Sequence, residues 1–283
     1  MRIAILIAAL TSLAPLAAAA QSPIAMPIAI DRPQRLGGNI PLVTLTINGI
    51  SGTFLLDTGA TATVVSRDFA ARAGLKPTGD AGGHDSAGTQ TQGQTLEPGR
   101  LSLPGASGGV EAFGLMAMDI PALAPLGVSG VFSPQSLAGD GCVNIDFKGN
   151  TVTYATAGAP ACRVDGMALV DHSSLRRPTV TLRIVETGRT VTLVLDSGAG
   201  RTVLPGDAGD GLPALDAGTS RSVTGTATAM QAVGPVTLMI GSHPVRLARA
   251  AIAAGAKTPV LGMDALGAAR IVLGADGTVA LDF

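Results

Sequence analysis

The chain has 283 residues, which is long enough for one large domain or two small ones. Its formal net charge of −1 gives no electrostatic basis for binding nucleic acid or an acidic membrane surface. Aromatic residues make up 2% of the chain and tryptophan is absent, so small aliphatic side chains must form the core. The 38 glycines and 18 prolines favour many short strands and turns, and therefore an all-β fold with few short helices.

The N-terminus has the pattern of a cleavable export signal over residues 1–20. An arginine precedes an apolar stretch over residues 3–16, and Ala18-Ala19-Ala20 come directly before Gln21. A membrane anchor is the alternative, but this run is shorter than the roughly 20 residues that span a bilayer. We expect cleavage after Ala20, a leader over residues 21–38, and a periplasmic or secreted protein without stable membrane insertion.

Regular elements follow the leader. Residues 40–47 alternate apolar and polar side chains and end at Asn48-Gly49, which is a hairpin signal, and residues 53–56 form the return strand. Ser66 then provides an N-cap for a brief helix over residues 67–73. The chain therefore begins as a β-hairpin with one short helix after it.

Residues 78–94 are polar and rich in glycine, and they include His84, Gly88, Thr89 and Gln90. One interpretation is a flexible surface loop. The other is a mobile hairpin that closes over a cleft, because glycine allows hinge motion and a polar strand buries little in a core. On the second interpretation, Gly88, Thr89 and Gln90 are the candidate residues of a flap.

Cys142 and Cys162 are the only cysteines of the chain. They flank a hairpin expected at Gly149-Asn150, and an exported protein with an even number of cysteines permits a disulfide. Two buried free thiols are the alternative. No histidine or further cysteine lies at ligand spacing, so we expect no metal site.

A seven-residue motif occurs twice in the chain. Residues 54–60 read FLLDTGA and residues 193–199 read LVLDSGA, so two apolar strands each end in an aspartate, a hydroxyl residue and glycine. A single copy would be an ordinary turn. Later segments recur in the same order, with offsets that fall from 139 to 127 residues. This pattern indicates a duplicated unit, and we place its two copies at residues 39–160 and 164–283.

The duplication predicts a pair of carboxylates. If the halves pack about a pseudo-two-fold axis, Asp57 and Asp196 approach within hydrogen-bonding distance. Two carboxylates about 3 Å apart repel by roughly 5 kcal/mol at an effective dielectric near 20, so they must share a proton near neutral pH. One is then a general base and the other a general acid, which together can activate water and hydrolyse an amide without a metal or another cofactor.

The residues after the aspartates can support this arrangement. Hydroxyls of Thr58 and Ser197 can hold the two loops together by hydrogen bonds. Gly59 and Gly198 leave room for close approach of the backbone and can donate amide N–H groups to the carboxylates.

The tandem Asp-Thr-Gly-Ala and Asp-Ser-Gly-Ala motifs resemble those of the aspartic protease superfamily, and most of all bacterial exported proteases with two retropepsin-like lobes. The resemblance covers roughly residues 36–283. It implies a bilobal aspartic-protease fold of the double-psi closed-barrel type with two pseudo-two-fold-related lobes. It also implies that Asp57 and Asp196 are catalytic, that Thr58 and Ser197 support them, and that the hairpin over residues 84–94 is a flap.

Three features depart from that family pattern. The second half keeps glycine in Val260-Leu261-Gly262, whereas the first half has Ser133 at the matching place. The expected flap contains no aromatic residue, and the single tyrosine, Tyr154, lies elsewhere. Arg201 follows the second acidic motif, where an inward orientation would keep a neighbouring aspartate ionised, and we expect it to face solvent.

Two functions follow from these observations. The first is an exported aspartic endopeptidase that acts as a monomer on a peptide or protein substrate, with Asp57 and Asp196 as its catalytic dyad. The alternative is a catalytically weak or inactive peptide-binding module that retains the fold. The intact pair of aspartates favours the enzyme, whereas Ser133 and the flap without an aromatic residue favour the module.

Overall fold

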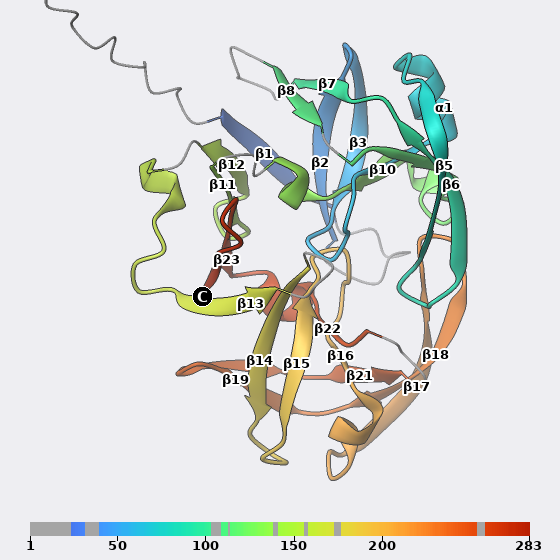
Figure 1. Ribbon diagram of the computed structural model, residues 1–283. Helices are drawn as coiled ribbons and strands as arrows, with labels where there is room; N and C mark the ends of the chain where they lie inside the picture. Colours follow the sequence, from blue (N-terminus) through green and yellow to red (C-terminus); the bar gives the residue numbers. More distant parts are fainter. Residues whose placement is uncertain are drawn as a thin grey trace, which may run out of the picture.

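The computed structural model describes residues 24–31, 40–102, 109–112, 114–137, 141–155, 158–172, 177–253 and 258–283. These residues form two β-rich lobes connected by a shared sheet (Figure 1). The export signal expected over residues 1–20 lies outside them. Within the described ranges, no helix is long and apolar enough to cross a membrane.

The first lobe is built almost entirely from strands. They are β2 (Ile40–Ile47), β3 (Ile50–Leu56), β4 (Val64–Ser66), β5 (Pro77–His84), β6 (Gln90–Leu96), β7 (Gly99–Ser102), β8 (Gly109–Ala112), β9 (Met116–Met118), β10 (Val128–Phe132), β11 (Cys142–Asp146) and β12 (Thr151–Ala155). Its helical segments are α1 (Arg67–Arg72) and the 3-10 helices η2 (Ala124–Leu126) and η3 (Pro134–Leu137).

The second lobe repeats this order. Its strands are β14 (Pro178–Ile184), β15 (Thr190–Leu195), β16 (Val203–Leu204), β17 (Ala214–Arg221), β18 (Ala227–Val233), β19 (Val236–Ile240), β20 (His243–Leu247), β21 (Ala250–Ala253), β22 (Val260–Leu261), β23 (Arg270–Gly274) and β24 (Val279–Asp282). Its helical segments are η5 (Gly206–Gly209) and α2 (Met263–Leu266), and the 3-10 helix η4 (Pro160–Cys162) lies between the lobes in the chain.

The strand pairings of the two lobes are equivalent. In the first lobe β3 pairs in parallel with β10 and antiparallel with β2, and in the second lobe β15 pairs in the same ways with β22 and β14. Each lobe continues through a parallel pair, β4–β9 or β16–β21, to a terminal hairpin, β5–β6 or β17–β18. This equivalence confirms the all-β fold with two pseudo-symmetric lobes.

The expected closed barrel is the one part of the fold that these pairings do not show. In each lobe the ladder of described strands runs from β2 or β14 to a hairpin, and the last strand of that hairpin, β5 or β17, pairs with no further strand. The reason lies in side-chain pattern, because β5 and β17 are largely exposed along their length. A strand without an apolar face gains little by closing a barrel around a core.

A six-stranded antiparallel sheet joins the lobes. Its centre is the pairing of β11 with β23, where Asn144 lies opposite Val272, and β12 and β24 flank this pair. The outer strands are β1 (Ile24–Asp31), which pairs with β12, and β13 (Ala168–His172), which pairs with β24. The segment expected to be a leader over residues 21–38 therefore supplies a strand of this sheet, which its irregular sequence pattern did not reveal.

Local chemistry accounts for the predicted elements at the start of the first lobe. Asn48 and Gly49 adopt positive φ angles of 49° and 82°, as a two-residue hairpin turn requires. The side chain of Ser66 accepts a hydrogen bond from the backbone N–H of Phe69, so the predicted N-cap of α1 is confirmed. In the second lobe Pro205 precedes the shorter 3-10 helix η5 instead.

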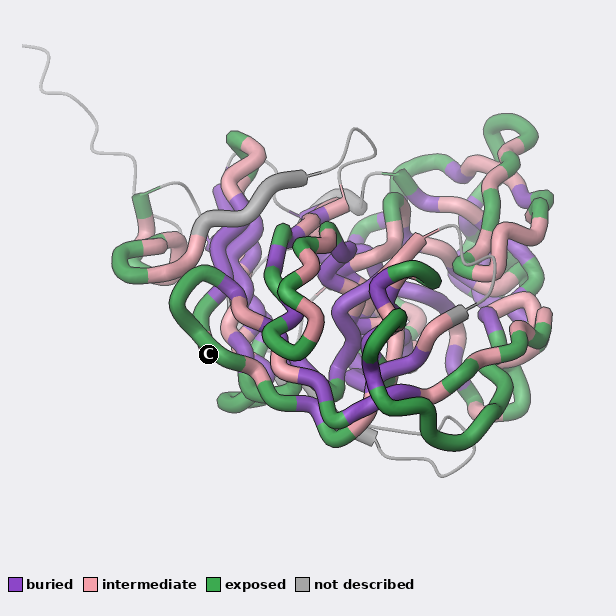
Figure 2. Tube along the Cα trace, turned by 90° about the horizontal axis from the view of Figure 1, so that it is seen from below, coloured by how far each residue is buried: buried purple, intermediate pink, exposed green. Residues whose placement is uncertain are grey.

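Small aliphatic side chains fill the interior, as the composition predicts. Figure 2 shows the buried residues mostly in the middle of the molecule and the exposed residues mostly at its periphery. The main core cluster is continuous across both lobes and includes Leu45, Leu56, Leu195 and Leu281. Phe54 and Phe69 add an edge-to-face aromatic contact with ring centroids 5.2 Å apart.

Cys142 and Cys162 form a disulfide with their Cα atoms 5.6 Å apart. It links β11, in the sheet between the lobes, to η4, which precedes the second lobe. The bond therefore anchors the connecting segment to the sheet. Cys142 is buried, and Ala155 and Val272 pack with it in a small apolar cluster.

Replacing both Cys142 and Cys162 with alanine should lower the free energy of unfolding by about 3 kcal/mol, because the bond closes a loop with a sequence separation of 20 residues. Urea denaturation of the double variant measures this loss. The wild-type protein treated with a reductant serves as the matched control and should lose a similar amount. A loss below about 1 kcal/mol in both cases would contradict the expectation.

Candidate active site

Asp57 and Asp196 lie at equivalent places, directly after β3 and β15. The backbone N–H of Asp57 donates to the carbonyl of Phe132 at 2.9 Å, and that of Asp196 donates to the carbonyl of Leu261 at 3.0 Å. The residue after each central strand is thus fixed by the parallel strand beside it. Both aspartates retain partial exposure to solvent.

Reciprocal hydrogen bonds hold the two acidic loops together. The hydroxyl of Thr58 accepts the backbone N–H of Ser197 at 3.1 Å and donates to the carbonyl of Leu195 at 2.6 Å. The hydroxyl of Ser197 accepts the N–H of Thr58 at 3.0 Å and donates to the carbonyl of Leu56 at 2.7 Å. Both side chains are fully buried. These four bonds, which we call the hydroxyl clamp, have the supporting role that the sequence suggested for Thr58 and Ser197.

Each glycine of the motif lies against the carboxyl group of the opposite lobe. A Cβ atom on Gly59 would be 2.8 Å from Cγ of Asp196, and one on Gly198 would be 2.7 Å from Cγ of Asp57. Real Cβ atoms do not approach other atoms so closely. Glycine is therefore required at both positions for the carboxyl groups to meet.

Backbone N–H groups hold each carboxyl in place. Oδ1 of Asp57 accepts from the N–H of Gly59 at 2.7 Å and from that of Ala60 at 3.0 Å. Oδ1 of Asp196 accepts from the N–H of Ala199 at 3.0 Å. A side-chain hydrogen bond joins the two carboxyl groups to each other. The structure thus brings together the two residues that the sequence proposed as a catalytic pair.

The two carboxyls share a proton, and their surroundings differ. Burial and the nearby negative charge of Asp196 raise the pKa of Asp57 well above its usual range, although N–H donors partly oppose this rise. Burial also raises the pKa of Asp196, but the hydrogen bond from Asp57 and the backbone donors keep that rise smaller. The pair therefore contains one protonated and one ionised carboxyl over a wide pH range.

Arg177 is a charged neighbour that the sequence reasoning missed. In the hairpin of β14 and β15, Thr179 lies opposite Val194, and the same register extended by two residues places Arg177 opposite Asp196. Its positive charge lowers the pKa of Asp196 and thus favours the ionised form there. The equivalent position in the first lobe is Ile40, which is buried. Counting the hairpin register back from Asp196 would have found this residue.

Ser133 is accommodated where the second lobe has glycine. A Cβ atom on Gly262 would lie 2.4 Å from the backbone of Arg201, so glycine is required there. In the first lobe the hydroxyl of Ser133 instead donates to the carbonyl of Ala60 at 2.8 Å. Gln135, which follows in η3, donates to the carbonyl of Thr58. Ser133 therefore helps to support the loop of Asp57 by a bond that glycine could not make.

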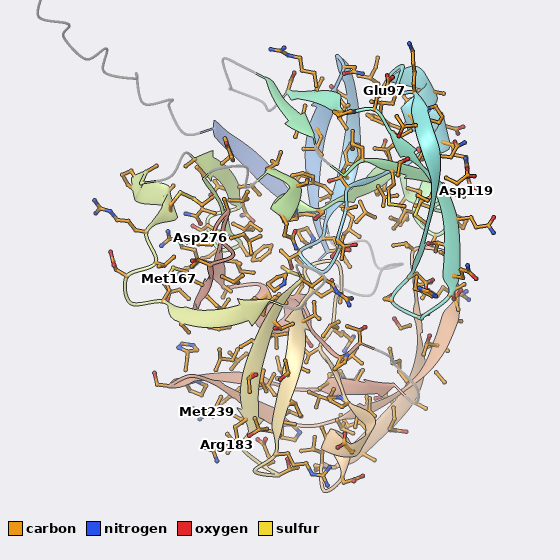
Figure 3. The ribbon with its side chains drawn as sticks, in the orientation of Figure 1. Glu97, Asp119, Met167, Arg183, Met239 and Asp276 are labelled. Carbon is orange, nitrogen blue, oxygen red and sulfur yellow. A yellow bond between two sulfur atoms is a disulfide. The ribbon has the colours of Figure 1, made fainter. Side chains whose placement is uncertain are left out.

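The other charged residues of interest lie away from the pair. Arg201 is exposed, as expected, and its charge acts on Asp264, whose pKa burial raises. The acidic residues labelled in Figure 3, which are Glu97, Asp119 and Asp276, are exposed on the outer surface. Among the described residues, no group of three or more histidine, cysteine or acidic side chains could hold a metal ion.

The segment with the flap candidates is a hairpin of β5 and β6, not an irregular loop. Gly88 and Thr89 lie in its turn, and Gln90 is the first residue of β6, where it pairs with His84. The second lobe has an equivalent hairpin, β17–β18, on the same side of the molecule (Figure 1). The repeat of Gly88-Thr89 as Gly225-Thr226 was the signal in the sequence for this second hairpin.

Comparisons with known proteins agree with this geometry. A family model described as aspartyl protease matches residues 43–119, which include Asp57. A search of curated proteins finds no match. Among solved structures, basic 7S globulin from soybean matches with a TM-score of 0.58 and 12% identity, over 93% of this chain and 95% of that one. The chain has a two-lobed fold like that of pepsin-like aspartic proteases, and its residues 43–119 are similar to the aspartyl protease family.

Replacing Thr58 with valine should destabilise the protein by about 2–4 kcal/mol, because it leaves the buried N–H of Ser197 and carbonyl of Leu195 without partners. Replacement with serine keeps the hydroxyl and should cost less than about 1 kcal/mol. Denaturant unfolding of both variants measures the difference. Equal losses in the two variants would mean that the hydroxyl contributes nothing specific.

Proposed function

We propose that this chain is an exported aspartic endopeptidase that hydrolyses peptide bonds with the dyad of Asp57 and Asp196. The observation that carries the proposal is the hydrogen bond between two carboxyl groups delivered by equivalent loops. The aspartyl protease family match over residues 43–119 supports it. Export rests on the signal pattern of residues 1–20.

Each carboxyl has a distinct role in this reaction. Asp196, the ionised member, takes a proton from a water molecule as its oxygen attacks the carbonyl carbon of the peptide bond. Asp57, the protonated member, donates its proton to the carbonyl oxygen, which gives a neutral tetrahedral intermediate. The carbon–nitrogen bond then breaks, the leaving nitrogen receives the proton held by Asp196, and Asp57 recovers a proton from the intermediate's hydroxyl. The pair returns to its starting state.

The surrounding residues prepare the dyad for this exchange. Backbone N–H groups fix the orientation of both carboxyls, so little reorganisation accompanies proton transfer. The charge of Arg177 favours Asp196 as the base and thereby Asp57 as the acid. Both halves of the dyad come from one chain, so we propose that the enzyme acts as a monomer on an extended peptide.

A catalytically inactive peptide-binding module is the second candidate function. The observation that favours it is the structural match to a protein named as a globulin, not as a protease. The carboxyl pair is intact, however, and the bonds made by Ser133 remove one reason to expect weak catalysis. Measurements of peptide-bond cleavage by the wild type and by variants of Asp57 and Asp196 distinguish the two functions.

Replacing Asp57 or Asp196 with asparagine should abolish cleavage of an unfolded protein at mildly acidic pH, because neither variant retains both a general base and a general acid. The rate of peptide-bond cleavage by the purified mature protein measures this. Equal cleavage by the wild type and both variants would assign the activity to another site or a contaminant. No cleavage by the wild type would favour the binding module.

The Asp57→Asn variant has a second readout that does not depend on turnover. Folding raises the pKa of Asp57, so the stability contributed by this group is greatest below its ordinary pKa of 3.8 and falls as the pH rises toward the raised value. Asparagine does not ionise. The variant should therefore be more stable than the wild type at neutral pH and similar to it at low pH, which denaturant unfolding at the two pH values measures.

Replacing Arg177 with methionine should move the acidic limb of the kcat/KM profile to higher pH, since Asp196 then loses a positive neighbour that keeps it ionised. The Arg177→Lys variant keeps the charge and should retain the wild-type profile within a few tenths of a unit. Measurement of kcat/KM between pH 3 and pH 7 tests both. An unchanged acidic limb in Arg177→Met would show that this charge does not tune the dyad.

A further inference from the structure

Gln135 is held in a defined orientation on the 3-10 helix η3. Leu137 of the same helix is buried and anchors it to the core of the first lobe. The hydroxyl of Ser133 lies 3.0 Å from Oε1 of Gln135, at hydrogen-bonding distance. Because Oε1 then faces this hydroxyl, Nε2 faces the carbonyl of Thr58 and donates to it. Gln135 thus supplies an N–H donor to one particular peptide group.

The peptide group that receives this bond is the one that holds Asp57. Its carbonyl belongs to Thr58 and its N–H to Gly59, and that N–H donates to Oδ1 of Asp57 at 2.7 Å. The N–H of Ala60 belongs to the next peptide group and donates to the same oxygen at 3.0 Å. A continuous path of hydrogen bonds therefore runs from Gln135 through one peptide group to the carboxyl. We call this path the amide relay.

The relay strengthens the N–H donor at its end. A peptide group that accepts a hydrogen bond at its carbonyl is more polarised, and such chains strengthen each bond by about 10–30%. The distances agree, because the N–H of Gly59 is the closer of the two donors to Asp57. Burial and the charge of Asp196 raise the pKa of Asp57, and among the groups that oppose them the N–H of Gly59 lowers it most.

The equivalent residue of the second lobe has a different role. Asp264 lies three residues after β22, as Gln135 lies three residues after β10. Oδ1 of Asp264 accepts the backbone N–H of Thr202 at 2.8 Å and the hydroxyl of Thr202 at 2.7 Å. An aspartate has no side-chain N–H to donate to a carbonyl. Asp264 therefore cannot extend such a relay to Asp196.

We propose that Gln135 is a positioning residue of the dyad, which acts through the Thr58–Gly59 peptide group to make Asp57 a more effective proton donor. When Asp57 gives its proton to the carbonyl oxygen of the substrate, its own carboxyl becomes negatively charged. The N–H of Gly59 binds this charged form more strongly than the neutral form, and Gln135 strengthens that N–H. This inference rests on the proposed proteolytic function and adds a residue that assists its general acid.

Replacing Gln135 with methionine removes the N–H donor and keeps a side chain of similar length. The basic limb of the kcat/KM profile, where the pair loses its shared proton, should move to higher pH, because the ionised form of Asp57 is then less well stabilised. The acidic limb should not move, because the relay does not act on Asp196. We expect kcat to fall by about threefold and KM to change by less than about twofold.

The other charged groups around the pair stay unchanged in this variant. Asp196 faces Asp57 across the lobe interface, and Arg177 acts on Asp196. Gln231→Met is the matched control, because the amide of Gln231 also donates to a backbone carbonyl, at 3.2 Å, but in the exposed hairpin of β17 and β18. Its profile should equal that of the wild type. An unmoved basic limb in Gln135→Met, or an equal movement in Gln231→Met, would overturn the proposal.

Nuclear magnetic resonance of the backbone amides tests the relay without turnover. In the wild type, the amide proton of Gly59 should resonate at lower field than that of Ala60 and should shift as the pair loses its shared proton. In Gln135→Met, the Gly59 signal should move to higher field and its titration midpoint to higher pH, whereas the Ala60 signal should change less. A Gly59 signal in the wild type at higher field than that of Ala60 would count against the relay.

Failure of the proposed function gives a different result. In that case the wild type cleaves no unfolded protein, although the titration of the Gly59 amide still responds to the replacement of Gln135. If instead the wild type cleaves and the Gly59 amide is the same in the wild type and Gln135→Met, the relay is rejected and the proteolytic function stands.

Discussion

The structure depends on the hydroxyl clamp between the two acidic loops. Thr58 and Ser197 each donate to a carbonyl of the opposite lobe and accept an N–H from it, so four buried polar groups are satisfied only when the lobes are correctly aligned. The same alignment places each motif glycine against the other carboxyl. Misalignment would leave buried groups unpaired, which is why the clamp fixes the geometry of the dyad as well as the lobe interface.

Because the two lobes are equivalent, the few residues that differ between them give equivalent positions different chemical properties. Two identical carboxyls in identical surroundings would have no preferred site for the shared proton. Here Arg177 occupies the place that Ile40 has in the first lobe, and it favours the ionised form of Asp196. At the hairpin tips, Asp85 has Ser222 as its equivalent. The carboxylate of Asp85 therefore accepts hydrogen bonds from hydroxyl groups of the second lobe, where a second carboxylate would have repelled it. In both cases a single difference between the copies assigns separate roles to equivalent positions.

Much of the fold and the site could be predicted from the sequence because the repeated motif contains both the strand pattern and the acidic residues of the site. Apolar runs ending at Asp57 and Asp196 predict the strands, and the constant order of later segments predicts two equivalent lobes. What could not be predicted depends on contacts between distant segments. The barrel remains open because β5 and β17 lack an apolar face, and the pairing of β1 with β12 was hidden because β12 lies far along the chain. Arg177 could have been found from hairpin register, but only once the register was known.

The position of β1 also has a consequence for the proposed cleavage of the N-terminus. This strand pairs with β12 through residues 24–27 and with β2 through residues 28–31, so it covers one backbone edge of each of these two strands. Trimming of the N-terminus beyond this point would expose backbone donors and acceptors on two neighbouring strands at once. Such edges recruit strands from other molecules and lead to aggregation. The proposed cleavage after Ala20 would leave β1 complete, because the first paired residue of this strand is Ile24.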